Sequence, residues 1–140
     1  MIVLDTGVLS ALMRREVDLA VVAWLDLQPS ESVWTAAVTV FEIRLGLGLL
    51  APARRRRQLV NAFSHVVDED FQGRILAFDH EAVREAASRA AERRAVGKPV
   101  DFRNIGIAGI VAERRATLAT RNPRHFQDLR IELVDPWVRR

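Results

Sequence analysis

The sequence has no cysteine, no tyrosine and a single lysine among its 140 residues. The lack of cysteine excludes disulfides and thiolate ligands for a metal. No basic segment precedes an apolar leader-like run, and no apolar stretch is long enough to cross a bilayer. We therefore expect a protein without a secretory signal or membrane span that acts in the cytoplasm.

Several common catalytic motifs are also missing. The chain has neither a Gly-x-x-x-x-Gly-Lys loop for nucleotide phosphates nor a Gly-x-Ser-x-Gly turn carrying a nucleophilic serine. Its three histidines, His65, His80 and His125, lack the spacing of metal ligands, and we interpret each as a surface or capping residue. P-loop chemistry, serine-hydrolase chemistry and histidine-centred metal sites are therefore not expected.

Basic charge is present and is carried almost wholly by arginine. There are 21 basic and 18 acidic residues, a formal net charge of +3, and Lys98 is the one lysine. Arginine stays protonated and binds phosphate in a bidentate manner, which suits nucleic acid or an acidic partner. A GC-rich genome produces the same arginine bias, so charge alone leaves the partner open.

Apolar residues make up 49% of the chain, enough for a hydrophobic core, and the length suits one domain over residues 1–140. Apolar runs with the strand period alternate with runs of helical period. This alternation predicts an α/β domain with a mainly parallel central sheet. Strands are predicted at 2–4, 32–36, 74–79, 117–120 and 131–135, and helices at 5–13, 18–27, 38–50, 52–66, 80–96 and 104–115.

Four polar residues are predicted to meet at one edge of this sheet. Asp5 and Asn122 each come just after a predicted strand, and sites in parallel sheets lie at the carboxyl ends of the strands. Glu42 falls on the apolar face of its helix, where a carboxylate is costly unless it is paired or bound to a metal. Asn104 lies in the first turn of its helix, on the face toward the sheet. Such carboxylate and amide oxygens suit Mg²⁺ and hydrolysis of a phosphodiester.

Each of these residues also has a structural interpretation. Asp5, Asn104 and Asn122 stand where helix caps are expected. Glu42 would be satisfied by an ion pair, although not with Arg44, because residues two apart on a helix do not face each other. The residue pattern by itself is compatible with both interpretations.

Three stretches resemble the PIN-domain toxins of the VapC/FitB type, and they occur in the family's order and spacing. They are "MIVLDTGVLS" at 1–10, "TAAVTVFEIRLGL" at 35–47 and "IAGIVAERRATLATRNPRHF" at 107–126. The resemblance covers essentially the whole chain. It implies a PIN-like three-layer α/β/α sandwich with a mainly parallel sheet. It also implies a Mg²⁺- or Mn²⁺-dependent endoribonuclease, the toxin of a type II toxin–antitoxin pair.

The resemblance implies partners as well. Such toxins act on RNA, form homodimers and are held inactive by a small VapB-like antitoxin that inserts a segment into the active-site groove. The antitoxin carries the DNA-binding domain, so the toxin meets DNA only through it. The four arginines at 54–57 are then compatible with contact to RNA, with contact to antitoxin, or with a solvated helix start.

By position, the resemblance implies that Asp5 and Glu42 are acidic metal ligands and that Asn122 is the fourth site residue. Asn104 takes the third position, where the family normally has an acid. Its carbonyl oxygen suits a metal but the charge is lost, so weaker metal binding and an attenuated enzyme are expected. Asp101 is an alternative carboxylate or, more simply, a loop or cap residue. A natural and an introduced asparagine are equally compatible with the sequence.

Two other functions remain open at this point. A catalytically inactive PIN domain would serve as a module that binds antitoxin or RNA. A phosphotransfer enzyme with Asp5 as nucleophile has less support, because no second aspartate follows two residues later and no suitably placed lysine is present.

Overall fold

The computed structural model describes residues 1–14 and 16–138 and contains a five-stranded, all-parallel sheet. The strand order is β3-β2-β1-β4-β5, so β1 lies at the centre, with Val3 beside Trp34 of β2 and Leu118 of β4. The predicted parallel sheet is confirmed, although the strand predicted at 74–79 pairs over only two residues. The strands are β1 Ile2–Leu4, β2 Val33–Ala36, β3 Ile75–Leu76, β4 Thr117–Ala119 and β5 Glu132–Val134.

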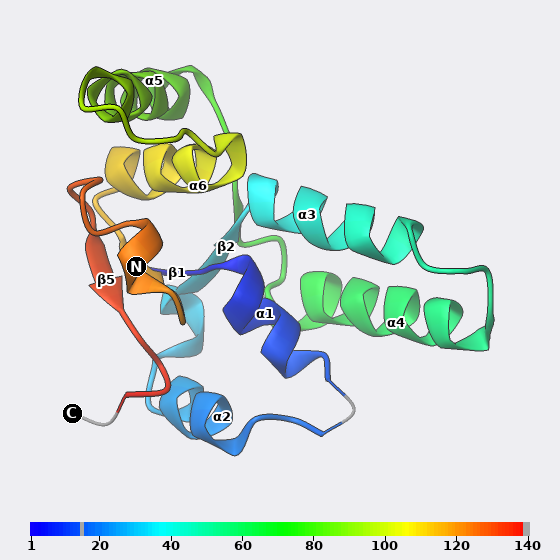
Figure 1. Cartoon of the computed structure of the whole chain (residues 1–140). Coiled ribbons are helices and arrows are strands. Elements are labelled where there is room, and N and C mark those ends of the chain that lie inside the picture. The colour runs from blue at the N-terminus through cyan, green and yellow to red at the C-terminus, as the bar shows by residue number, and fades with distance from the viewer. Residues whose placement is uncertain (15, 139–140) are drawn as a thin grey trace.

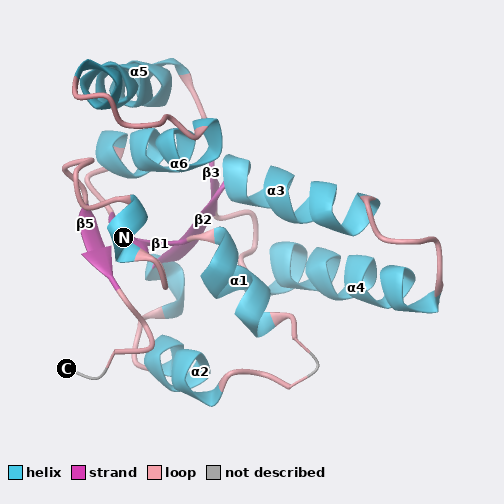
Figure 2. Cartoon of the chain, viewed as in Figure 1, coloured by secondary structure: helices cyan, strands magenta, loops and turns pink. Residues whose placement is uncertain are grey.

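Helices cover both faces of the sheet, which gives a three-layer α/β/α sandwich (Figure 1). The helices α5 and α6 lie together on one side, whereas α1 and α2 lie on the other, and α3 and α4 project sideways as an antiparallel pair (Figure 2). None of the helices in the described part of the chain has the length and hydropathy to cross a bilayer. Their bounds are α1 Thr6–Leu12, α2 Leu19–Asp26, α3 Ala37–Gly48, α4 Arg54–His65, α5 His80–Ala95 and α6 Phe102–Glu113, with short 3₁₀ turns at Ser30–Ser32 and Pro123–His125 and a π turn at Val66–Asp70.

Two hydrophobic cores hold the layers together. One packs α5 and α6 against the sheet and includes Ile107 and Leu118, both almost fully buried. The other lies beneath α1, α2 and the α3–α4 pair and includes Leu9 and Phe63. Parallel strands covered on both faces need apolar side chains on both faces. This explains why the central strand reads as the continuous apolar run "IVL".

Four helices begin at an aspartate whose carboxylate accepts a backbone N–H, the usual N-cap interaction. Asp5 accepts from Val8 at 2.9 Å, which confirms its predicted capping interpretation. Asp101 accepts from Arg103 at 2.9 Å, so α6 begins at Phe102, two residues before the predicted start. The prediction that Asn104 caps this helix is therefore wrong, and the cap interpretation of Asp101 is confirmed. The other two caps are Asp18 and Asp79.

The backbones of α5 and α6 approach each other closely at Gly109. A Cβ atom there would lie 2.5 Å from the Ala82 carbonyl oxygen and 2.7 Å from the Ala86 Cβ. We expect Gly109→Ala to lower the free energy of unfolding by about 1–3 kcal/mol, because the two backbones must separate. Urea unfolding followed by circular dichroism measures this change.

The control is Gly48→Ala in α3, where an added Cβ meets nothing within 4 Å. Alanine favours a helix by about 0.5–1 kcal/mol over glycine, so this variant should be as stable as the parent or slightly more stable. If the Gly109→Ala and Gly48→Ala proteins unfold at the same urea concentration, the close α5–α6 contact is contradicted.

Candidate active site

A small polar pocket of about 140 Å³ lies at the carboxyl ends of β1 and β4. The chain leaves β1 toward β2 on one side of the sheet and β4 lies on the other, so this is the point where strand order reverses. Ligands of parallel sheets bind at such points. The structure brings all four predicted site residues to it. The lining residues are Asp5, Thr6, Gly7, Glu42, Asn104, Ile107, Thr120, Asn122, His125 and Phe126.

Asp5 is fixed at the pocket by its position directly after β1. Its N–H donates to the Ala119 carbonyl at 3.1 Å, which continues the β1–β4 pairing, while one carboxylate oxygen caps α1. The side chain is buried, and burial raises its pKa above the ordinary aspartate value, although the Thr120 hydroxyl and backbone N–H groups act in the opposite direction. The carboxylate of Asp5 therefore both caps α1 and carries a negative charge that is unfavourable in a buried position. A cationic ligand would stabilise this charge.

Glu42 enters the pocket from the middle of α3. Burial raises its pKa, while the Thr6 hydroxyl and the positive charge of Arg103 counteract the rise. Arg103 lies 3.8 Å from its carboxylate and is half exposed. The ion-pair interpretation of Glu42 is thus partly right, with Arg103 as partner, and Arg44 instead places its guanidinium over the ring of Phe63. Glu42 stays available to a ligand because this pair is long and open to solvent.

The two asparagines reach the pocket from different segments. Asn104 is the third residue of α6 and is half-buried. Asn122 holds the N-cap position before Pro123, yet its side chain makes no capping hydrogen bond; instead its N–H donates to the Thr120 hydroxyl at 3.1 Å. Asp101 does not line the pocket, and its carboxylate is already used by the α6 cap. Neither amide oxygen is consumed by a helix cap.

Sequence reasoning missed three polar residues that line the same pocket: Thr6, Thr120 and His125. Thr120 directly follows β4, so the rule that selected Asp5 and Asn122 also applies to it. His125 is exposed, as predicted, but its place beside the pocket depends on the turn after Pro123, which has no periodic signal. These residues add two hydroxyls and one imidazole to the carboxylates and amides.

The segment that carries Asn122 and His125 is tied to α5 by Arg93. The guanidinium of Arg93 donates to the His125 carbonyl at 2.6 Å and to both carboxylate oxygens of Asp128, at 2.8 and 3.0 Å. Bidentate contacts of this kind are geometrically specific. The hydrogen bonds from Arg93 lower the pKa of Asp128 to about 2. Arg93 therefore holds in place the segment that carries Asn122 and His125, which line one side of the pocket.

We expect Asp128→Asn to remove a pH-dependent part of the stability. Because the pKa of Asp128 is lowered to about 2 in the folded state, its contribution is complete above the ordinary pKa of about 4 and is lost as the pH falls toward 2. Urea midpoints measured across this range should lie lower for the variant at pH 6 and converge with the parent in acid. Asp68→Asn, an exposed residue without an ion pair among the described residues, is the control. A constant difference at all pH values would contradict the assignment.

The oxygen atoms of the pocket fit a hard divalent cation. Two carboxylates and two amides surround it, and the buried Thr6 hydroxyl at its rim makes no hydrogen bond of standard geometry. Within the described residues no group of three or more histidine, cysteine or acidic side chains is placed to hold a metal. A site with one or two carboxylates is what Mg²⁺ uses when water and substrate phosphate complete its shell.

The family profile described as PIN domain matches residues 2–132. The chain belongs to the PIN-domain family. It is 35% identical over 137 residues to the VapC ribonuclease Y4jK of Sinorhizobium fredii, and the match covers 98% of each chain. It is 33% identical over 137 residues to Toxin FitB of Neisseria gonorrhoeae, covering 98% of this chain and 99% of the relative. The solved structure of FitAB bound to an IR36 DNA fragment superposes with a TM-score of 0.90 at 32% identity, covering 100% of this chain and 98% of that one.

This PIN domain is therefore of the VapC/FitB type. The pocket at the reversal of its strand order is built from β1, α3, α6 and the turn after β4, four segments far apart in the sequence. Asp5 and Glu42 bring two formal negative charges to it, and Arg103 lies 3.8 Å from the carboxylate of Glu42. Carboxylate and amide oxygens are the donor types that hard divalent cations prefer.

Proposed function

We propose that this PIN domain is a Mg²⁺- or Mn²⁺-dependent endoribonuclease that acts on cytoplasmic RNA as the toxin of a type II toxin–antitoxin pair. The single observation that carries the proposal is the convergence of Asp5, Glu42, Asn104 and Asn122 on one pocket of a VapC/FitB-type fold. The chain is a nuclease-type PIN domain related to the VapC ribonuclease Y4jK. The dependence on a metal is our inference from the oxygen donors.

Asp5, Glu42 and Asn104 would hold the cation, and each contributes differently. The bound ion would polarise the phosphodiester and lower the pKa of a water molecule. Asp5 and Glu42 supply the negative charge, and their burial makes a cation the most favourable partner. Asn122 and Thr120 line the pocket after β4 and are joined by a hydrogen bond from the Asn122 N–H to the Thr120 hydroxyl. His125 would supply a side-chain N–H, a donor suited to a phosphate oxygen.

We further propose that the enzyme is attenuated. Asn104 offers a neutral carbonyl oxygen at the position where the family usually has an acid, so the cation is attracted by two carboxylates in place of three. Arg103 next to it competes electrostatically for Glu42. Both features weaken cation binding, so the enzyme should need a higher concentration of metal to act.

The partners follow from the same relatives. We propose a small VapB-like antitoxin that covers the pocket and carries the DNA-binding domain, as supported by the name of the FitAB–DNA complex. We also propose a homodimer. The exposed side chains of Phe41, Leu45 and Leu49 form an apolar row along α3, which supports association with a second copy. Sedimentation of the purified chain tests the dimer, and finding a neighbouring gene for a small DNA-binding protein that co-purifies with the chain tests the antitoxin.

The deciding experiment for the proposed activity is cleavage of RNA by the purified protein. A mixture of structured and single-stranded RNAs is incubated with Mn²⁺, with Mg²⁺ or with EDTA. Cleavage that appears with either metal and disappears with EDTA is the expected result. Intact RNA under all three conditions, from a protein with a normal unfolding transition, would favour the second candidate, a binding module. The specific observation behind that candidate is Asn104 in the pocket.

A further inference from the structure

Four consecutive arginines, residues 54–57, begin α4, and none of them lines the small polar pocket. The N-terminus of a helix carries partial positive charge, so arginine is unfavourable there. The first turn of α4 has no acidic residue, and Ala53 makes no side-chain cap. Within residues 1–14 and 16–138, none of the four forms an ion pair. An anionic ligand outside the described chain would relieve this repulsion.

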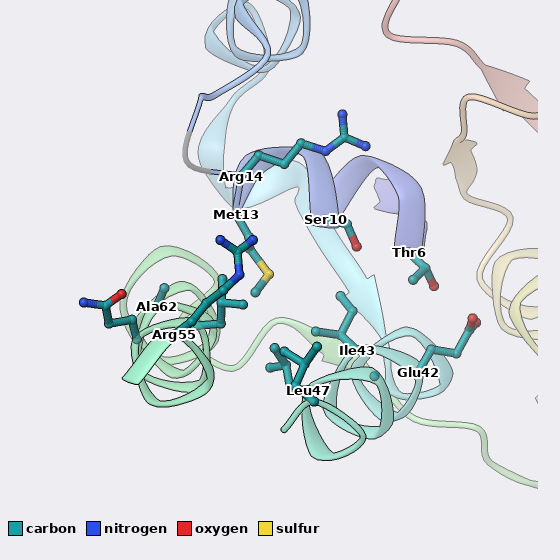
Figure 3. A pocket seen from close by; sticks show the side chains of 13 residues that line it. Thr6, Ser10, Met13, Arg14, Glu42, Ile43, Leu47, Arg55 and Ala62 are labelled. Carbon is teal, nitrogen blue, oxygen red and sulfur yellow. The ribbon is translucent and has the colours of Figure 1, made fainter. Parts of the chain in front are cut away.

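One of these arginines lies on a groove that leads to the candidate active site. The groove has a volume of about 770 Å³ and lies between α1, α3 and α4 (Figure 3). At one end it is lined by Thr6 and Glu42, which also line the small polar pocket. At the other end Arg55 extends from α4 toward the end of α1, where Met13 and Arg14 lie (Figure 3). The groove and the pocket are therefore one continuous surface.

The charges along this groove are arranged for an anion. Its floor is apolar, with Ile43 and Leu47 among the lining residues. Arg14 and Arg55 are both exposed at the outer end, and among the described residues Glu42 is the only acidic one that lines the groove, at the pocket end. A ligand that extends outward from the pocket therefore passes from the candidate metal-binding carboxylate to the guanidinium of Arg55, with Arg14 on the rim formed by the end of α1 (Figure 3). Guanidinium groups bind phosphate oxygens in a bidentate manner.

We propose that this groove binds the sugar–phosphate backbone of the single-stranded RNA next to the cleaved bond, with Arg14 and Arg55 contacting phosphates. The inference rests on the proposed ribonuclease activity. When the reacting phosphate lies in the pocket, the neighbouring phosphates of the RNA strand must lie on a surface that adjoins the pocket. The groove between α1, α3 and α4 is such a surface, and Arg14 and Arg55 lie at its outer end. From Glu42 to Gly48, the last residue of α3, the helix rises about 9 Å, roughly the length of two to three stacked nucleotides. Arg54, Arg56 and Arg57 extend the basic surface beyond the groove.

Salt-dependent RNA binding tests the proposal. The protein carries Asp5→Asn so that it binds RNA without cleaving it, and a fluorescein-labelled single-stranded RNA is titrated at several KCl concentrations. Adding Arg14→Gln and Arg55→Gln should weaken binding roughly tenfold at low salt. The slope of log affinity against log salt should fall by about 1.4, because each phosphate contact with a single strand contributes about 0.7.

The matched control replaces Arg84 and Arg94 of α5 with glutamine, which removes the same charge far from the groove (Figure 1). This control should leave the slope unchanged. Equal slopes for the groove variant and the control, in proteins with the same melting temperature, would overturn the groove assignment alone. If the groove variant binds RNA normally but loses the antitoxin, the groove is a protein-binding surface. Absence of any RNA binding both by the Asp5→Asn parent and by the unsubstituted protein with Mn²⁺ would overturn the ribonuclease proposal as well.

Discussion

Asp5→Asn is expected to abolish RNA cleavage and, at the same time, to raise the stability of the protein. The carboxylate is buried at the pocket, where its charge attracts the proposed cation, and asparagine removes that charge. Asparagine caps helices as well as aspartate does, so the hydrogen bond from Val8 is retained. Opposite changes in activity and stability are the mark of a residue retained for function.

The stability effect should depend on pH in a defined direction. Burial raises the pKa of folded Asp5 above that of the unfolded chain, so folding favours the neutral acid. Stability is therefore lost as the pH rises from about 4 through the folded pKa, and the variant escapes this loss. Thermal unfolding should show similar melting temperatures at pH 4 and a higher one for Asp5→Asn at pH 7. In addition, Mn²⁺ should stabilise the parent but not the variant. Full cleavage by Asp5→Asn would remove Asp5 from the active site.

Asn104→Asp is expected to strengthen metal binding and increase cleavage. The new carboxylate would face the same pocket as Asp5 and Glu42, and a third negative charge close to a dication should improve its affinity by roughly tenfold to a hundredfold. Without metal the variant should be less stable than the parent, because three like charges then lie together. Mn²⁺ binding followed by calorimetry, and melting with and without Mn²⁺, measure both effects.

The control for this substitution is Asn61→Asp, which adds the same charge on the exposed surface of α4. It should leave the affinity for Mn²⁺ near that of the parent. If Asn104→Asp behaves like Asn61→Asp, position 104 is not a ligand and the attenuation hypothesis is wrong. If metal affinity rises but cleavage does not, the pocket binds the cation and the chain is a binding module.

The site residues that could be predicted are those whose positions follow from the periodicity of a strand or a helix. Asp5 comes after an apolar run that fits a buried strand, and Glu42 is a charged residue on an apolar helical face. The start of α6 could not be predicted as well, because Asp101 and Asn104 are both good caps and the chain between them has no period of its own. His125 depends on the path of a turn held by Arg93, a contact between residues 32 apart in the sequence.

The fold was predictable to a similar degree. Helix and strand periods identified the alternation of elements and hence the parallel sheet. The shortness of β3, at Ile75–Leu76, was not visible, because this edge strand pairs only with β2 and the following residues turn toward the Asp79 cap. The π turn at Val66–Asp70 was not visible either, since apolar spacing does not distinguish it from the end of a helix.

The central position of β1 also bears on when the pocket forms during protein synthesis. Ile2 of β1 lies beside Thr117 of β4, so this second neighbour of β1 is synthesised long after β1 itself. Asn104, Thr120 and Asn122 are made equally late. The pocket consequently cannot assemble before Asn122 has been synthesised and β4 has paired with β1. The order of synthesis thus lets β1 pair with β2 long before the pocket is complete.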